Sequence, residues 1–180
     1  MSTEPLPSEL DARKAAARGA LVSGTLRPAD LSRFKALLAG EEGHIRAELG
    51  FSRDEEGRCL VRVMIDADVE VTCQRCLQPL NRRVESDSTL AIVWTEEQAG
   101  QLPRNLEPLV LGAQDADLWS IVEEELMLAL PAFSYHESAA CKEILANYSG
   151  AAPEEEVPAG KKPNPFDVLA QLKRGKILEE

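Results

Sequence analysis

Residues 58–80 have the sequence RCLVRVMIDADVEVTCQRCLQPL, a long alternating segment that ends in two closely spaced cysteines. From Cys59 to Val71 every second residue is apolar, and charged residues occupy most of the positions between them. A period of two is typical of a β-strand with one buried and one solvated face. We expect the rest of the fold to be arranged around this strand, with Cys59 in the core.

The alternation resumes after the cysteines. Val84, Leu90 and Ile92 fall on one face of the following segment, and charged residues lie opposite them. Two such segments joined by about eight residues predict a β-hairpin, and Pro79, which cannot donate to a ladder, gives its tip an irregular shape. Cys73 and Cys76 therefore lie at the tip of the hairpin.

The remaining pattern predicts an α+β fold: a small antiparallel sheet of about four strands, one or two packed helices and a tethered C-terminal helix. Further strands are expected at 19–26 and 44–51, and the apolar run 109–111 can add a short one. A helix should begin at Pro28, where proline suits the first turn, and end at Gly40.

A second helix is predicted between Asp117 and Pro131. Asp117 is a suitable N-cap, and the apolar residues that follow have helical spacing. Three consecutive glutamates interrupt this pattern. We expect Glu123 and Glu124 to face water, whereas Glu125 lies nearer to the apolar stripe.

Changes in composition divide the chain into segments. The N-terminal residues are polar and contain two early prolines, so we expect a mobile lead-in there. A later stretch rich in Pro, Glu and Gly has almost nothing to bury, which is typical of a linker. The predicted boundaries are 1–17 for the lead-in, 18–146 for a single α+β domain, 147–164 for the flexible linker and 165–175 for a C-terminal docking helix.

The C-terminal helix has clear start and stop signals. Asn164 can cap it, Pro165 occupies its first position and Gly175 follows its last turn. About ten residues are too few for a stable isolated helix, so we expect it to dock on another surface. The predicted contact residues are Phe166, Val168, Leu169, Leu172, Lys173 and Arg174.

Length and charge limit the classes of function. The 180 residues suffice for one domain with a buried core, and an aromatic fraction of 4% predicts an aliphatic one. A net charge of −11 argues against broad binding to phosphate backbones. Contact with RNA should therefore be local, or be relayed through a basic partner protein.

No segment approaches the roughly 20 apolar residues that a membrane helix needs. The N-terminus lacks the pattern of a secretory signal, and four unevenly spaced cysteines do not resemble a secreted disulfide framework. We predict a cytoplasmic protein without membrane contact.

Cys73 and Cys76 admit three interpretations. Structural zinc takes four nitrogen or sulfur ligands, and a Cys-x-x-Cys turn supplies two. Cys141 and His136 can complete the set from a distant loop. The alternatives are unliganded thiols and a redox couple, although a thioredoxin-like couple begins a helix, whereas strand pattern follows here.

The hairpin tip also carries the best local basic patch, Arg75, Arg82 and Arg83, which we expect to contact RNA or a partner protein. No aromatic residues are interleaved with these arginines, so the tip lacks the stacking platforms of single-stranded RNA readers. No Ser/His/Asp set, phosphate-binding glycine loop or HExxH motif is present. We expect neither an enzyme nor a small-molecule substrate.

Four segments together resemble the bacterial YceD family, the large ribosomal RNA subunit accumulation proteins. They occur in family order and are TCQRCLQPL (72–80), VEEELMLALP (122–131), HESAAC (136–141) and KPNPFDVLAQLKR (162–174). Some relatives carry a second Cys-x-x-Cys pair where this chain has His136 and Cys141. The resemblance implies a role in ribosome biogenesis without an established enzymatic activity.

The function that we predict is therefore that of a non-enzymatic factor supporting synthesis, processing or accumulation of large-subunit ribosomal RNA. Its partners would be ribosome precursors or proteins associated with that RNA, and its RNA contact would be indirect. One alternative is a zinc-dependent adaptor between proteins. Another is a thiol oxidoreductase that uses Cys73 and Cys76.

Overall fold

The computed structural model describes residues 4–112, 115–139, 141 and 143. The chain divides into two units, residues 1–145 and 146–180, and the described residues belong to the first. The predicted linker (147–164) and docking helix (165–175) lie outside the described residues, together with the six contact residues from Phe166 to Arg174. Both segments stay predictions.

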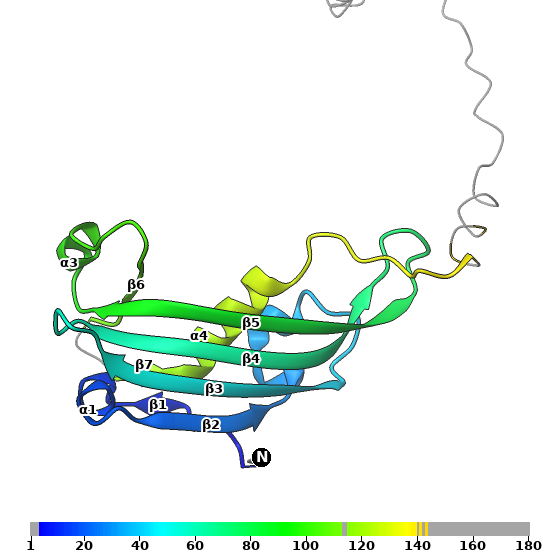
Figure 1. The fold of residues 1–180 in the computed structure, drawn as a ribbon. Helices are drawn as coiled ribbons and strands as arrows, with labels where there is room; N and C mark the ends of the chain where they lie inside the picture. The colour runs from blue at the N-terminus through cyan, green and yellow to red at the C-terminus, as the bar shows by residue number, and fades with distance from the viewer. Residues whose placement is uncertain (1–3, 113–114, 140, 142, 144–180) are drawn as a thin grey trace, which may run out of the picture. The chain divides into compact units, whose positions relative to one another are not determined.

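A five-stranded sheet forms the centre of the first unit (Figure 1). Neighbouring strands are antiparallel except β5 and β6, which are parallel and joined through the short helix α3 (Glu96–Gly100). The predicted α+β class, the hairpin and the short strand are confirmed. In sheet order the strands are β2 (Leu21–Leu26), β3 (Gly43–Arg53), β4 (Cys59–Thr72), β5 (Pro79–Val93) and β6 (Glu107–Val110).

Strands β4 and β5 pair along their whole length, from Cys59 opposite Ile92 to Thr72 opposite Pro79. Every odd-numbered residue of β4 is buried, including Cys59, which confirms the predicted inward face. Val61 and Val63 lie in the same core cluster as the buried residues of β3. One face of the sheet is therefore continuously apolar and needs a cover.

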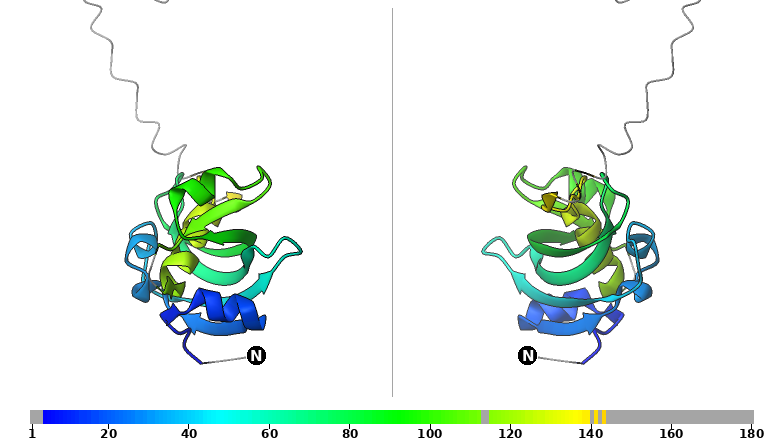
Figure 2. Two further views of the ribbon diagram at one scale, coloured as in Figure 1. Left: turned by 90° about the vertical axis from the view of Figure 1, so that its left-hand side faces the viewer. Right: turned by 90° about the vertical axis from the view of Figure 1, so that its right-hand side faces the viewer.

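Helices α1 (Ala12–Arg18) and α4 (Leu118–Ala129) cover this face (Figure 2). The helix predicted from Pro28 to Gly40 is wrong in its length, because it is split into a 3₁₀ turn, η1 (Pro28–Asp30), and a short helix, α2 (Ser32–Lys35). Leu31 has an extended backbone between them (φ −110°, ψ 98°). Leu31 and Phe34 are buried, so the apolar stripe lies where the sequence indicates.

The expected mobile lead-in is wrong for the described residues 4–17, which are part of the core. Strand β1 (Glu9–Leu10) pairs with β7 (Ala116–Asp117), and α1 buries three alanines. Leu6 is also buried, and its N–H donates to the carbonyl of Thr25 at 3.1 Å. A polar composition does not reveal these contacts because each partner lies far away in the sequence.

Gly24 allows the N-terminal segment to approach the edge strand β2. A Cβ atom at this position would lie 2.5 Å from backbone atoms of Leu6, which is too close for any side chain. The Thr25 N–H donates to the carbonyl of Glu4 at 2.9 Å, so Thr25 is hydrogen-bonded to the N-terminal segment through both its N–H and its carbonyl. The segment protects part of a sheet edge that would otherwise be open.

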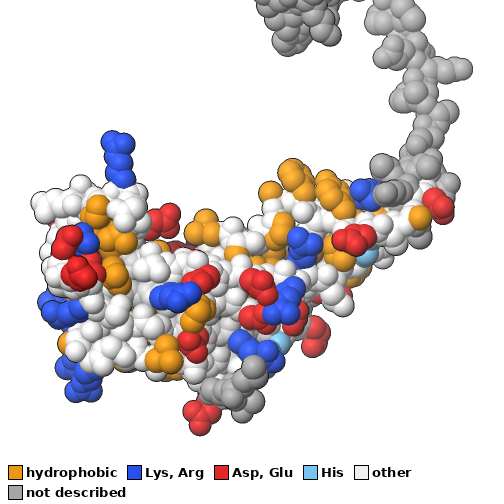
Figure 3. All heavy atoms as spheres, in the orientation of Figure 1, with side chains coloured by type: hydrophobic (Ala, Val, Ile, Leu, Met, Phe, Trp, Pro, Cys, Tyr) orange, Lys and Arg blue, Asp and Glu red, His pale blue; other side chains and the backbone are white. Residues whose placement is uncertain are grey.

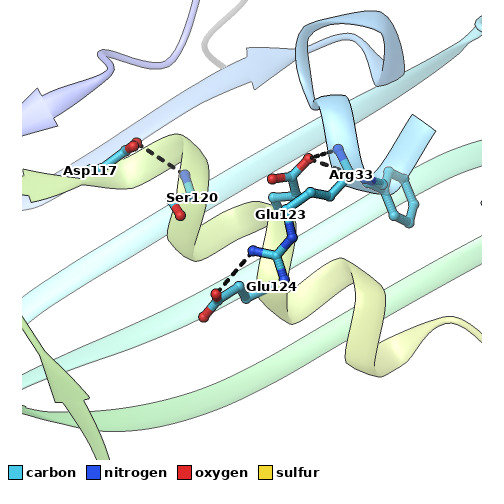
Figure 4. Close-up of polar contacts among 6 residues, drawn as sticks. Arg33, Asp117, Ser120, Glu123 and Glu124 are labelled. Carbon is cyan, nitrogen blue, oxygen red and sulfur yellow. Dashed lines mark hydrogen bonds and ion pairs between the residues drawn. The ribbon is translucent and has the colours of Figure 1, made fainter. Parts of the chain in front are cut away.

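Helix α4 begins at the predicted N-cap, where Asp117 Oδ1 accepts from the N–H of Ser120 at 3.0 Å (Figure 4). It ends before Pro131, as expected. Glu125 is buried, and the Ser86 hydroxyl donates to its Oε2 at 3.1 Å. None of the helices in the described part of the chain combines the length and apolar character that crossing a bilayer requires.

Glu123 does not face water, contrary to the prediction. Its side chain is buried, and Oε1 accepts from the N–H groups of Arg33 at 2.7 Å and Phe34 at 3.1 Å (Figure 4). N–H groups in the first turn of a helix have no partner within that helix, so the carboxylate caps α2 from a neighbouring helix. Glu124 is exposed, as predicted, and pairs with the Arg33 guanidinium at 3.1 Å.

Candidate metal centre

The turn between β4 and β5, residues 73–78, is stabilised by its own backbone, and we call it the knuckle. The Cys73 N–H donates to the carbonyl of Gln78 at 3.0 Å, and the Leu77 N–H donates to the carbonyl of Cys73 at 2.9 Å. Leu77 has a positive φ of 60°, which is uncommon for a residue with a side chain. The surrounding structure must therefore stabilise this conformation.

The chain returns to the knuckle after α4. Residues 133–136, which we call the return segment, run beside the β4–β5 turn (Figure 1). The Gln74 N–H donates to the Ser134 carbonyl at 3.0 Å, and the Ser134 N–H donates to Gln74 Oε1 at 2.5 Å. This reciprocal pair joins parts of the chain that are 60 residues apart.

The return brings His136 and Cys141 to the two knuckle cysteines. The Cys73 and Cys141 sulfurs are 3.6 Å apart, and the Cys76 sulfur lies 3.3 Å from His136 Nδ1. All four candidate ligand atoms lie within 4.8 Å of one another. Within the described ranges, no other histidines, cysteines or acids form such a group. The structure thus assembles the ligand set that the sequence predicted.

Two of the thiols have opposite pKa shifts. Burial by itself raises the pKa of Cys73, but hydrogen bonds from the backbone N–H groups of Cys76, His136 and Arg75 outweigh it and lower the pKa to about 5. Burial, followed by contacts with the other two sulfurs, raises the pKa of Cys141. The cluster therefore holds a thiolate at Cys73, the form that binds metals, beside a thiol at Cys141.

His136 is oriented by a second hydrogen bond. Its Nε2 lies 3.0 Å from the carbonyl oxygen of Pro79. A carbonyl can only accept, so Nε2 carries the proton and Nδ1 presents its lone pair to the cluster. A backbone carbonyl that fixes the tautomer in this way is common behind metal-binding histidines.

The geometry fits zinc. A tetrahedral ion with Zn–S bonds of about 2.3 Å places two sulfur ligands about 3.8 Å apart. The Cys73–Cys141 separation of 3.6 Å is already close to this value. The largest separation in the set, within 4.8 Å, would have to shorten by about 1 Å, which side-chain rotation can supply.

The three arginines predicted at the tip come from two elements. Arg75 lies in the knuckle, whereas Arg82 and Arg83 lie on β5, where consecutive residues point to opposite faces. Arg83 pairs with Asp66 and, at 2.9 Å, with Glu85. Arg82 and Arg83 both line one shallow surface hollow, with Asp68 and Glu70. Contact of the three arginines with RNA or protein stays a prediction.

Sequence reasoning missed the residues that position the ligands. Gln74 and Ser134 join the return segment to the knuckle, and the Pro79 carbonyl orients His136. Tyr135 lies beneath the guanidinium of Arg75, with 5.0 Å between the guanidinium carbon and the ring centroid. The side chain of Gln74 gives no signal in the sequence, but the order Phe-Ser-Tyr-His (133–136) is an alternation that could indicate an extended segment.

The fold and the site define an α+β protein whose longest hairpin carries a Cys₃His cluster at its turn. The family profile described as "Large ribosomal RNA subunit accumulation protein YceD" matches residues 61–173, which include the knuckle, α4 and the return segment. A protein of that name from Haemophilus influenzae is 33% identical over 177 residues, covering 97% of this chain and 99% of the relative. The chain belongs to the YceD family. No solved structure matches it significantly.

Proposed function

We propose that this protein is a non-enzymatic, cytoplasmic factor that supports the accumulation of large-subunit ribosomal RNA. The observation that carries the proposal is the match to a relative named for this role along 97% of the chain. The acidic balance, with a net charge of −11, favours partners that include basic proteins bound to that RNA.

The Cys₃His cluster serves this function as a structural zinc site. Four protein ligands fill a tetrahedral shell and leave no position for substrate, which is typical of structural sites. The ligands come from the knuckle and from the chain after α4, so zinc would join two segments distant in sequence. A bound ion would cross-link these two segments and would take no part in a reaction.

A thiol oxidoreductase is a weaker explanation of the same cysteines. The reaction requires a sulfur that another molecule can attack. Cys73 has the lowered pKa that such a role needs, but it is completely buried. The Cys141 sulfur, 3.6 Å from that of Cys73, is also buried, so Cys76 is the one partly exposed cysteine of the cluster.

The partners would be ribosome precursors or proteins associated with large-subunit RNA. The tail residues Phe166, Val168, Leu169, Leu172, Lys173 and Arg174 are proposed to dock on such a partner, because their apolar stripe needs a surface to cover it. Deletion of residues 161–180 should then abolish function in cells while the melting temperature of the purified protein changes by only a few degrees.

The proposed function can be tested by deleting the gene and measuring the ratio of large- to small-subunit ribosomal RNA. We expect the ratio to fall, and a plasmid copy of the wild type to restore it. Cys76→Ser should fail to restore it, whereas Cys59→Ala, which removes a core cysteine outside the cluster, should succeed. An unchanged ratio in the deletion strain would contradict the proposal.

A further inference from the structure

Large apolar side chains are exposed around the knuckle. Leu77 is 72% exposed, Phe133 is 68% exposed and Tyr135 is 45% exposed. In the space-filling view, hydrophobic side chains gather over the end of α4 and the loop after it, toward the β4–β5 turn (Figure 3). Two exposed aromatic rings within three residues are notable in a chain whose aromatic fraction is only 4%.

Phe133 and Tyr135 flank the residue that anchors the return segment. Ser134 is buried against the knuckle and His136 contacts Cys76, whereas the side chains of Phe133 and Tyr135 are exposed. Exposed aromatic side chains stack unpaired bases in RNA-binding domains. The knuckle fixes the backbone of the return segment through the Gln74–Ser134 pair.

Arg75 provides a cation beside these rings. Its guanidinium lies over Tyr135, and one of its nitrogens donates to the Cys141 sulfur at 3.9 Å. The arginine therefore connects the candidate metal centre to the aromatic surface. A guanidinium above an aromatic ring can stack a base and contact a phosphate at the same time.

We infer that Phe133, Tyr135 and Arg75 form a platform that stacks two unpaired bases of single-stranded RNA. This inference rests on the proposed function, and it replaces the indirect RNA contact expected from the net charge with direct contact at the knuckle. It also corrects the expectation that the tip lacks stacking residues, since the aromatic residues come from a segment 60 residues further along the chain.

The charge of the protein determines what kind of RNA fits. A net charge of −11 disfavours a long duplex, whose phosphates would lie along an acidic surface. Stacking on aromatic rings tolerates any base, and Arg75 is the one cation in this platform, so few phosphate contacts are expected. The platform should therefore bind short single strands with weak dependence on salt.

The test is a fluorescence anisotropy titration of the full chain, loaded with zinc, against a labelled single-stranded RNA of about 12 nucleotides. Phe133→Ala and Tyr135→Ala should each weaken binding by about 5-fold or more. Phe133→Tyr and Tyr135→Phe, which keep the rings, should bind like the wild type. The slope of log K against log salt should be shallow, about −0.7 for each phosphate contacted.

Leu21→Ala is the matched control, because Leu21 is exposed at the end of the sheet opposite the knuckle. Equal affinity of the ring variants and the wild type would overturn the inference, as would equal binding of single-stranded and duplex RNA. Ring variants that instead detach from ribonuclease-treated precursor particles would show a protein contact, which also overturns it. If the wild type binds no RNA although gene deletion lowers large-subunit RNA, the proposed function stands without the platform.

Discussion

The sheet and the knuckle are held together by different forces. The layer of β3, β4, β5 and α4 buries a continuous set of aliphatic side chains, with Val61, Val63 and Leu126 completely inaccessible. Around the knuckle and the return segment the buried side chains are those of Cys73, Ser134 and Cys141, while the large apolar side chains of Leu77, Phe133 and Tyr135 are exposed. Hydrophobic burial stabilises the first region whatever ions are present, whereas the second contains a ligand set whose stability depends on what it binds.

The sheet therefore provides most of the stability of the protein, and the knuckle presents its exposed apolar surface. A core of interdigitated side chains tolerates little change, because each lost contact leaves a cavity. A metal-dependent turn can present exposed rings without a large apolar core beneath it. The two regions should therefore respond in opposite ways to core mutation and to metal removal.

The largest expected effect is on the sheet. Phe51→Ala removes a buried ring from β3 and should lower the free energy of unfolding by about 3–5 kcal/mol, through lost burial and the cavity left behind. Chemical denaturation measures this loss. Leu21→Ala on the exposed edge should change it by less than about 0.5 kcal/mol. A small effect of Phe51→Ala would mean that the core is not as closely packed as the structure shows.

Metal removal should affect the knuckle more than the sheet. Stripping zinc with a chelator should lower the melting temperature by about 5–10 °C and expose amides of the knuckle to hydrogen exchange, while β3 and β4 stay protected. Cys141→Ser should reproduce the effect without chelator. Protein purified without chelator that contains no zinc, and whose melting is unaffected by chelation, would exclude the metal site.

Two adjacent glutamates provide a sharper comparison within α4. Glu123→Ala leaves the N–H groups of Arg33 and Phe34 without their acceptor and should cost about 2 kcal/mol. Glu124→Ala removes an exposed ion pair and should cost less than about 0.5 kcal/mol. Thermal and urea unfolding of both variants check this. Equal effects would indicate that the cap on α2 contributes little.

The pH prediction concerns zinc affinity and not folding. The raised pKa of Cys141 means that zinc must displace its proton, whereas Cys73, with a pKa of about 5, is already a thiolate at neutral pH. Zinc affinity should therefore rise with pH between about pH 6 and about pH 8, by about tenfold per unit for each proton displaced. Cys73 should contribute to this dependence only near or below its own pKa.

Calorimetry in buffers with different ionisation enthalpies counts the protons released. Cys141→Ser should remove one of them, although it also weakens binding. An affinity that does not change over this pH range would show that Cys141 is not a ligand.

The sequence by itself determined the elements whose order is local. The alternation from Cys59 to Val71 predicted β4 with its buried face, and Asp117 with Pro131 predicted the limits of α4. The spacing of Cys73 and Cys76 indicated a turn able to bind metal, and the structure brings the distant candidates His136 and Cys141 to that turn. Periodicity and capping act between residues a few positions apart, so the pattern alone reveals them.

Only the tertiary structure decided the contacts between distant segments. It placed residues 4–17 in the core and the Glu123 carboxylate at the start of α2. It also brought Tyr135 beneath Arg75. Each outcome depends on which distant segments of the chain are in contact in the folded protein, and composition does not indicate those contacts. The aromatic surface and the assembled ligand set arise from the same long-range return of the chain to the knuckle.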